Sequence, residues 1–132
     1  MIKVKDVMNA GVVTVDPDDT VEEAMSRMLK LGISGLPVVD TAGQLLGIIT
    51  EFDLLELVWD PNTSNNKVYH YMTRDVRSLD EEDELADVAD LFRVLPIRRL
   101  VVTRGRQVVG IVSRRDLIWY VLQLRSHCPA RN

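Results

Sequence analysis

The chain has 132 residues and a net charge of −4, and 46% of its residues are hydrophobic. This length fits one compact domain or two small halves that pack together. No apolar run approaches the roughly 20 residues that span a bilayer, and the N-terminal residues MIKVKDVMNAG lack the hydrophobic region of a signal peptide. Cys128 is the single cysteine, so the chain cannot form an internal disulfide. We therefore expect a cytoplasmic protein that does not associate with membranes.

Charge is unevenly distributed along the chain. Residues 1–66 carry 4 basic and 11 acidic side chains, whereas residues 67–132 carry 12 basic side chains, 11 of them arginine, and 9 acidic ones. Arginine suits phosphate and carboxylate recognition, although a solvated basic face is the usual alternative. No Lys/Arg-rich tract with interleaved aromatic residues argues for nucleic acid binding. His70 and His127 are the only histidines, which leaves little material for a zinc site or a Cys–His nucleophile.

The first predicted elements are a short strand over Val12–Val15, an acidic turn and a helix over residues 20–31. Two strands joined by a turn follow in LPVVDTAGQLLGIIT, and a last helix is expected to begin at Thr50. We expect Val38, Val39, Val101 and Val102 to be buried together with the apolar stripe of the first helix. That stripe has the spacing i, i+3, i+4, i+7 and i+8 and consists of Val21, Ala24, Met25, Met28 and Leu29.

The same series of elements recurs in the second half of the chain. Residues 4–8 align with residues 68–72 at a spacing of 64, and Val38-Val39 aligns with Val101-Val102 at 63, so we place one lost residue between helix and strand. The second copy has a strand over Val76–Leu79, two strands in RLVVTRGRQVVGIVS, and a helical stripe at Leu85, Val88, Ala89 and Phe92. The predicted organisation is repeat 1 at 1–59, a linker at 60–67, repeat 2 at 68–125 and a tail at 126–132.

Both copies end in one motif, GIITEFDLL at 47–55 and GIVSRRDLI at 110–118. In each copy a hydroxyl residue precedes an aspartate by three positions, first Thr50 and Asp53, then Ser113 and Asp116. This spacing is typical of a helix capping box, in which the hydroxyl accepts a hydrogen bond from a backbone N–H of the first turn and the acid accepts one from the cap residue's own N–H. The recurrence leaves two interpretations open, a structural cap used twice or half of a binding site used twice.

A β-α-β-β-α unit of about 60 residues is too small to bury its own faces comfortably. The predicted fold class is therefore α/β, with two such repeats packed in pseudo-twofold symmetry. This packing leaves two equivalent clefts between the halves, and ligand sites prefer such interfaces.

The doubled sequence resembles a pair of cystathionine-β-synthase (CBS) domains, together called a Bateman module. The resemblance covers nearly the full chain and is carried by DVM at 6–8, GLPVVDTAGQLLGIITEFDLL at 35–55 and RRLVVTRGRQVVGIVSRRDLI at 98–118. It implies a stand-alone regulatory module that binds AMP, ADP, ATP or, as a less favoured ligand, S-adenosylmethionine, and signals the ligand's level to an unidentified partner protein. Energy sensing is the implied role. No cofactor is expected, and magnesium is expected only together with ATP.

The resemblance also assigns residues to the first cleft, where the hydroxyl and aspartate of the second motif hold ribose and phosphate. A helix N-terminus supplies N–H groups and a favourable dipole for phosphate, and a carboxylate accepts charge-assisted hydrogen bonds from a ribose diol. The second motif and four arginines are expected to face an early strand and a helix-to-strand turn of the first repeat. The residues are Thr14, Ile33, Ser34, Gly35, Arg98, Arg99, Ser113, Arg114, Arg115 and Asp116.

The second cleft is expected to be weaker or empty. There Thr50 and Asp53 would face Arg77 and the turn that begins at Ile97. Glu51 stands where the first cleft has Arg114, and the bulky Arg98 and Arg99 replace Ser34 and Gly35.

Two other functions are weighed against nucleotide sensing. In the main alternative the chain is a ligand-free dimerisation or interaction module, and the Thr/Ser-x-x-Asp motifs are only helix caps. An enzyme is disfavoured because no histidine stands near either motif and no phosphate-binding Gly-rich loop or metal-ligand cluster is present. The apolar segment LIWYVLQL at 117–124 further predicts a homodimer, unless this helix only packs on its own sheet.

Overall fold

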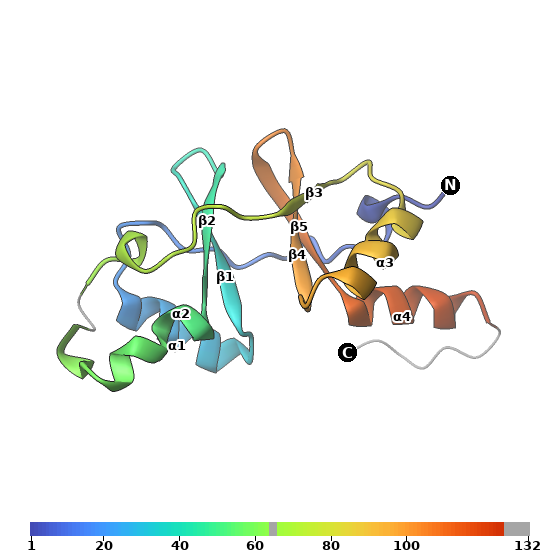
Figure 1. Ribbon diagram of the computed structural model, residues 1–132. Coiled ribbons are helices and arrows are strands. Elements are labelled where there is room, and N and C mark those ends of the chain that lie inside the picture. Colours follow the sequence, from blue (N-terminus) through green and yellow to red (C-terminus); the bar gives the residue numbers. More distant parts are fainter. Residues whose placement is uncertain (64–65, 126–132) are drawn as a thin grey trace. The chain divides into compact units, whose positions relative to one another are not determined.

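The computed structural model describes residues 1–63 and 66–125, which form two compact units (Figure 1). Unit 1 comprises residues 1–12, 77–105 and those from 109 onward, and unit 2 comprises residues 13–76 and 106–108. The units are mixed α/β, as predicted, but each combines segments from both halves of the sequence. The predicted tail at 126–132 and two residues of the linker, 64 and 65, lie outside the described residues.

Unit 2 contains an antiparallel hairpin and two helices that pack against it. Its elements are α1 (Val21–Leu31), β1 (Gly35–Val39), β2 (Leu45–Thr50) and α2 (Glu51–Leu54), which a 3-10 helix continues at Leu55–Val58. Thr20 begins α1 as its N-cap by accepting a hydrogen bond from Glu23 N, and Gly32 ends it with a left-handed φ of 65°. The core includes Val15, Val21, Ala24, Met28, Leu36, Val38, Ile49 and Val68.

The predicted helix at 20–31 is confirmed, but three of the side chains that were expected to be buried are not fully buried. Leu29 is 79% exposed, and Met25 and Val39 are only half-buried. At 100° per residue, Leu29 lies about 80° around the helix from Val21, at the edge of the stripe. Val21, Ala24 and Met28 are buried as expected.

Unit 1 contains a three-stranded sheet with strand order β3-β4-β5, and β3 runs parallel to β4. Its elements are β3 (Ser78–Asp80), α3 (Leu85–Val94), β4 (Arg99–Arg104), β5 (Gln107–Ser113) and α4 (Arg114–Gln123). The core includes Leu79, Leu85, Val88, Phe92, Leu100, Val102 and Val112, and the N-terminal segment adds Val4 and Val7.

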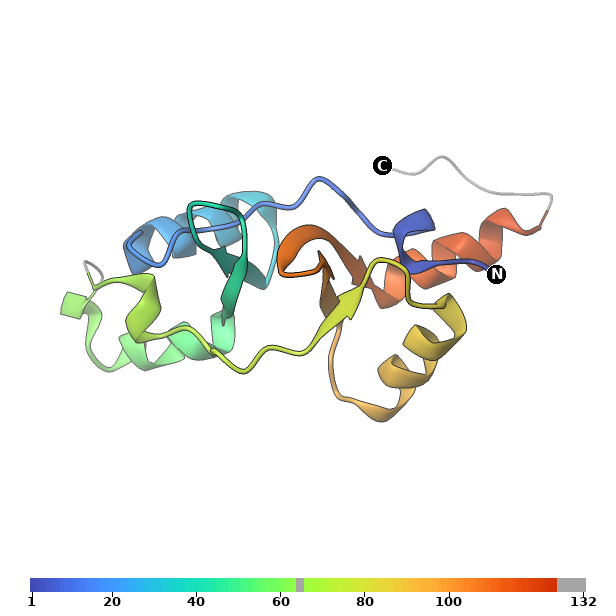
Figure 2. The same cartoon turned by 90° about the horizontal axis from the view of Figure 1, so that it is seen from above.

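The segment that begins each repeat packs with the body of the other repeat. In unit 1, Val4 N donates to Asp83 O at 2.9 Å, and Asn9 N donates to Ile111 O at 2.8 Å. Figure 2 shows this N-terminal segment, in blue, beside the orange and red elements of the second half. In unit 2, the equivalent segment bonds to the first half, because Thr73 N donates to Ile48 O at 2.8 Å. The compact units therefore divide the chain differently from the sequence repeats.

The strand expected over Val12–Val15 is wrong, since only Val15 forms a bridge, parallel to Val38. The counterpart of this bridge in unit 1 is the pair Leu79↔Val102 within the regular β3–β4 ladder. Val15 and Leu79 are 64 residues apart, and so are Val38 and Val102. The strands of the two repeats therefore align at a spacing of 64 residues and not 63. The residue lost from the second repeat therefore falls in the hairpin turn, and its predicted position between helix and strand is wrong.

Two prolines explain why the ladder is not extended in unit 2. With the spacing of 64, Pro37 is the counterpart of Val101, which pairs with Ser78 in the ladder. Pro17 is the counterpart of Glu81, whose N–H donates to Thr103 O at 3.0 Å. Because proline has no N–H, neither of these positions can donate to a parallel ladder beside Val15.

Candidate functional site

Both Thr/Ser-x-x-Asp motifs form capping boxes at helix N-termini. At α4, Ser113 N donates to Asp116 Oδ2 at 2.7 Å, and Asp116 N donates to Ser113 Oγ at 3.3 Å. At α2, Thr50 N donates to Asp53 Oδ2 at 2.9 Å, and Asp53 N donates to Thr50 Oγ1 at 3.3 Å. The prediction of two caps is confirmed. A carboxylate has about four acceptor positions, so capping a helix and accepting from a ligand are compatible uses of one aspartate.

The two helix N-termini differ in length and charge. The helix α4 has 10 residues and begins with Arg114 and Arg115, whereas α2 has 4 residues and begins with Glu51. The helix dipole favours acidic side chains in a first turn and disfavours basic ones. The exposed arginine pair therefore opposes the dipole of α4, and a bound anion at this position would offset that cost.

The turn before β4 adjoins the N-terminus of α4. Arg114 N donates to Arg98 O at 3.2 Å, so the Arg98–Arg99 and Arg114–Arg115 pairs stand on adjoining stretches of backbone. The Nε of Arg99 is buried and has no hydrogen-bond partner among residues 1–63 and 66–125. Because a buried donor without an acceptor is unfavourable, a hydrogen bond from this Nε–H to a ligand oxygen would be stabilising.

The corresponding turn of unit 2 holds Ser34 and Gly35 beside the N-terminus of α2. Glu51 N donates to Ser34 O at 2.9 Å, and Gly35 pairs with Thr50 across the hairpin. A Cβ atom at Gly35 would lie 3.2 Å from both Ile49 O and Thr50 Cγ2, which is a tight contact. A side chain at position 35 would therefore be tightly packed against β2, a feature of the hairpin that the sequence did not show.

Thr14 and Ile33 complete the unit 2 group. Thr14 is half-buried, and its carbonyl accepts a hydrogen bond from Arg27 Nη1 at 2.8 Å. Ile33 packs against the unit 2 core, and its N–H donates to Met28 O at 3.0 Å. Ser113 and Asp116 belong to unit 1, so the residues assigned to the first cleft come from both units.

The residues predicted for the second cleft also come from both units. Thr50 and Asp53 belong to unit 2, whereas the exposed Arg77 and the partly buried Ile97 belong to unit 1. Sequence reasoning missed Thr73, whose hydroxyl donates to Asp53 Oδ1 at 3.3 Å. Its only sequence signal is its place directly after the Met of the recurring N-terminal segment.

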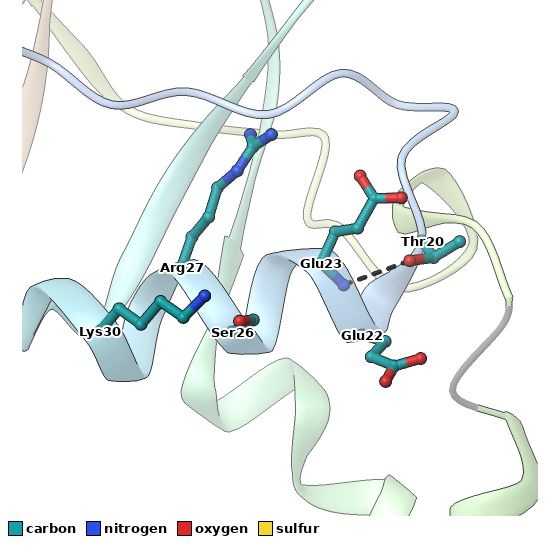
Figure 3. A pocket seen from close by; sticks show the side chains of 6 residues that line it. All are labelled: Thr20, Glu22, Glu23, Ser26, Arg27 and Lys30. Atoms are coloured by element: carbon teal, nitrogen blue, oxygen red, sulfur yellow. Dashed lines mark hydrogen bonds between the residues drawn. The ribbon is translucent and has the colours of Figure 1, made fainter.

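Two surface pockets lie on unit 2. A pocket of about 560 Å³ on α1 is lined by Thr20, Glu22, Glu23, Ser26, Arg27 and Lys30 (Figure 3). A smaller apolar pocket of about 170 Å³ is lined by Met25, Met28, Leu29, Glu51, Leu54, Leu55 and Val58. Neither pocket contains a residue of the two predicted sets.

Within the described part of the chain, no group of three or more His, Cys, Asp or Glu side chains is arranged to hold a metal ion. No helix in the same part of the chain has both the length and the apolar character needed to cross a membrane.

Comparison with known proteins identifies the family. The CBS domain family model matches twice, at residues 4–60 and 68–123. An inosine-5'-monophosphate dehydrogenase of Methanocaldococcus jannaschii is 37% identical over 88% of this chain, which spans only 23% of that enzyme. The CBS domain-containing protein YhcV of Bacillus subtilis is 33% identical, with coverage of 89% of this chain and 84% of the relative.

Solved structures with the same fold include two with bound adenosine compounds. The structure of CBSX2, a CBS-pair protein from Arabidopsis thaliana, in complex with AMP has a TM-score of 0.85 and 26% identity, covering 94% of this chain and 98% of CBSX2. The CBS domain pair of protein MJ0100, in complex with 5'-methylthioadenosine and S-adenosyl-L-methionine, has a TM-score of 0.79 and 28% identity, covering 95% and 99% of the two chains. With two family matches over most of its length and the same α/β repeats, the chain belongs to the CBS domain family as a tandem pair.

Proposed function

We propose that this chain is a regulatory module that binds an adenosine-containing ligand, with AMP, ADP or ATP favoured over S-adenosylmethionine. Two similar CBS pairs support the ligand class, because one has been solved with AMP and the other with 5'-methylthioadenosine and S-adenosyl-L-methionine. The dehydrogenase relative does not argue for enzyme activity, since this chain matches only 23% of that protein. The ligand's level is passed to a separate partner protein, which gives the module a role in energy sensing.

The observation that carries the proposal is the concentration of positive charge at the N-terminus of α4. Arg98, Arg99, Arg114 and Arg115 stand on two stretches joined by a backbone hydrogen bond, next to the Ser113 cap. A helix N-terminus favours phosphate, and guanidinium groups bind phosphate oxygens through paired donors. This charge pattern opposes the helix dipole, so helix stability alone does not account for it.

Each residue set has a proposed role. Asp116 accepts hydrogen bonds from the ribose, while Ser113 and the four arginines bind phosphate. The backbone of Ile33–Gly35 is proposed to contact an adenine edge, and Thr14 is proposed to contact an adenosine ligand. The hydrogen bond from Ser113 N holds the carboxylate of Asp116 in place. A group that binds a diol needs to be held rigidly in this way.

The Thr50–Asp53 set is proposed to bind more weakly. The helix α2 has a single turn and begins with Glu51, so its N-terminus is a poor phosphate site.

The alternative function is a ligand-free interaction module. It is favoured by the completeness of both capping boxes, which by themselves explain the recurrence of the motif. Calorimetric titration of nucleotide-stripped protein with AMP, ADP, ATP and S-adenosylmethionine separates the two functions. We expect saturable binding of at least one adenine nucleotide, with one strong site per chain. Heat of dilution alone for all four compounds would favour the interaction module.

A homodimer is also proposed, because α4 has a second apolar face. Leu117 and Tyr120 pack on the unit 1 core, whereas Ile118, Val121 and Leu124 are exposed. A second copy of the chain would cover this face and remove the exposed apolar surface from water.

A further inference from the structure

Arg27 makes two contacts across the segment that precedes α1. Its Nη1 donates to Thr14 O at 2.8 Å and lies 3.6 Å from Asp19 Oδ2. Asp19 in turn closes the acidic turn, because its Oδ2 accepts from Asp16 N at 3.0 Å. Figure 3 shows Arg27 extending from α1 toward this preceding segment. The guanidinium group therefore ties the backbone before the turn to the carboxylate that ends it.

The second repeat fixes the same segment in a different way. Ser78, the counterpart of Thr14, is held in the β3–β4 ladder opposite Val101. The counterpart of Arg27 is Leu91, an apolar residue packed against the unit 1 core. An arginine thus replaces a leucine in the one repeat whose early strand is not formed.

Besides the contact with Arg27, the hydrogen bonds nearest to Thr14 are those of its neighbour Val15. Val15 is held on both sides, since its N–H donates to Pro37 O and its carbonyl accepts from Val39 N, each at 3.0 Å. Pro37 and Pro17 have no N–H with which to extend this pairing in either direction. The Arg27 hydrogen bond is therefore the nearest additional restraint on the Thr14 backbone.

We propose that Arg27 is a positioning residue that fixes Thr14 for contact with the adenosine ligand and thereby sets the affinity of the module. This inference rests on the proposed function for its ligand, but the restraint of Thr14 can be measured without ligand. A charge-assisted hydrogen bond to a carbonyl is stronger than a neutral one, and here it acts on a segment with a single strand bridge. Arg27 itself is not proposed to touch the ligand.

The test combines hydrogen exchange with calorimetry on the full chain. Arg27→Leu copies the residue found in the second repeat, and Arg27→Lys keeps a cationic donor. Lys30→Leu, which removes a positive charge from the same helix, is the matched control. We expect Arg27→Leu to speed exchange of the Val15 amide and to raise the dissociation constant for AMP, each roughly three- to tenfold, the range of one hydrogen bond.

Further readouts make the outcomes distinct. The Ile48 amide, which donates to Thr73 in the same unit, should exchange as in the parent in all three variants. Arg27→Lys should restore much of both effects, and Lys30→Leu should show neither. If the Val15 amide of Arg27→Leu exchanged at the rate of the parent, the proposal that Arg27 restrains the Thr14 backbone would be wrong. If the Val15 amide of Arg27→Leu exchanged faster but AMP affinity were unchanged, the proposed contact between Thr14 and the ligand would be wrong.

Failure of the proposed function gives a different result. If the parent protein binds none of AMP, ADP, ATP and S-adenosylmethionine, the proposed function and the affinity effect of Arg27 both fall. The Val15 exchange rates then still decide whether Arg27 holds Thr14.

Discussion

At the residue scale, two aspartates with the same capping geometry are assigned different functions. Asp53 and Asp116 each accept from the backbone N–H of the cap residue, at 2.9 and 2.7 Å. Asp53→Ala and Asp116→Ala are therefore expected to lower the free energy of unfolding by similar amounts, about 0.5–2 kcal/mol, which is typical of a lost cap. Urea unfolding without ligand measures this. Losses that differ by several kcal/mol would show that one aspartate has a structural role beyond its cap.

A second residue-scale prediction concerns pH. Arg104 hydrogen-bonds to Glu81 and holds the pKa of that carboxyl below its usual value of 4.5. Because the pKa is lower in the folded state, the pair stabilises the fold above the unfolded pKa, and this contribution is lost as pH falls through the folded pKa. We expect Arg104→Gln to be less stable than the parent at pH 7, with the difference shrinking below about pH 4.5. A difference that stays constant between pH 7 and pH 3 would contradict this linkage.

The site was only partly predictable at this scale. The capping boxes followed from the spacing of Thr50 and Ser113 to their aspartates, because capping depends on local geometry alone. The contacts of Arg27 with Thr14 and of Thr73 with Asp53 join residues 13 and 20 positions apart. Such contacts depend on how the chain folds back, so no local pattern indicates them.

At the element scale, the arginines that begin α4 are expected to trade stability for ligand binding. Arg114→Glu places at α4 the residue type that begins α2. It should raise the free energy of unfolding without ligand by about 0.3–1 kcal/mol, because an acidic first turn suits the helix dipole. The same change should weaken AMP binding at least tenfold through loss of a charged hydrogen bond.

Arg93→Glu on the exposed face of α3 provides the matched control for net charge. It should leave AMP affinity close to that of the parent at physiological ionic strength. If Arg93→Glu weakened binding as much as Arg114→Glu, the effect would come from overall charge and not from the N-terminus of α4.

The elements themselves were predicted well where periodicity decides them and poorly where single residues do. The stripe from Val21 to Met28 predicted α1 because a helix needs only a repeating apolar pattern. The strand expected at Val12–Val15 failed because Pro17 and Pro37 lack the donors for a parallel ladder. Pro37 lies in a distant strand, and its partner could not be known before the register was known.

At the scale of the whole molecule, the exchange of N-terminal segments between repeats is the feature that sequence could not reveal. Residues 4–8 and 68–72 are similar, so each could pack with either repeat by pattern alone. The hydrogen bonds from Val4 to Asp83 and from Val68 to Asp19 show that each segment packs with the other repeat. The repeats, in contrast, were visible because the same motifs recur at a nearly constant spacing.

The proposed homodimer is tested at this scale by light scattering. The parent at tens of micromolar is expected to have twice the 15.0 kDa mass of the chain. Val121→Asp places a charge on the exposed face of α4, so we expect it to yield a monomer with little change in unfolding free energy. A 15.0 kDa particle for the parent would rule out the homodimer under these conditions.

The central claim is that the second motif binds an adenine nucleotide, and paired calorimetric titrations of Asp116→Ala and Asp53→Ala with AMP test it most directly. Asp116→Ala should raise the dissociation constant roughly tenfold to hundredfold, which corresponds to the 1.5–3 kcal/mol of a hydrogen bond to a charged group. Asp53→Ala should bind AMP nearly as the parent does. If the parent binds AMP and both variants bind it equally well, the motifs are helix caps and the assigned site is wrong. If Asp53→Ala alone loses affinity, AMP binds at the first motif and the preference for α4 is contradicted.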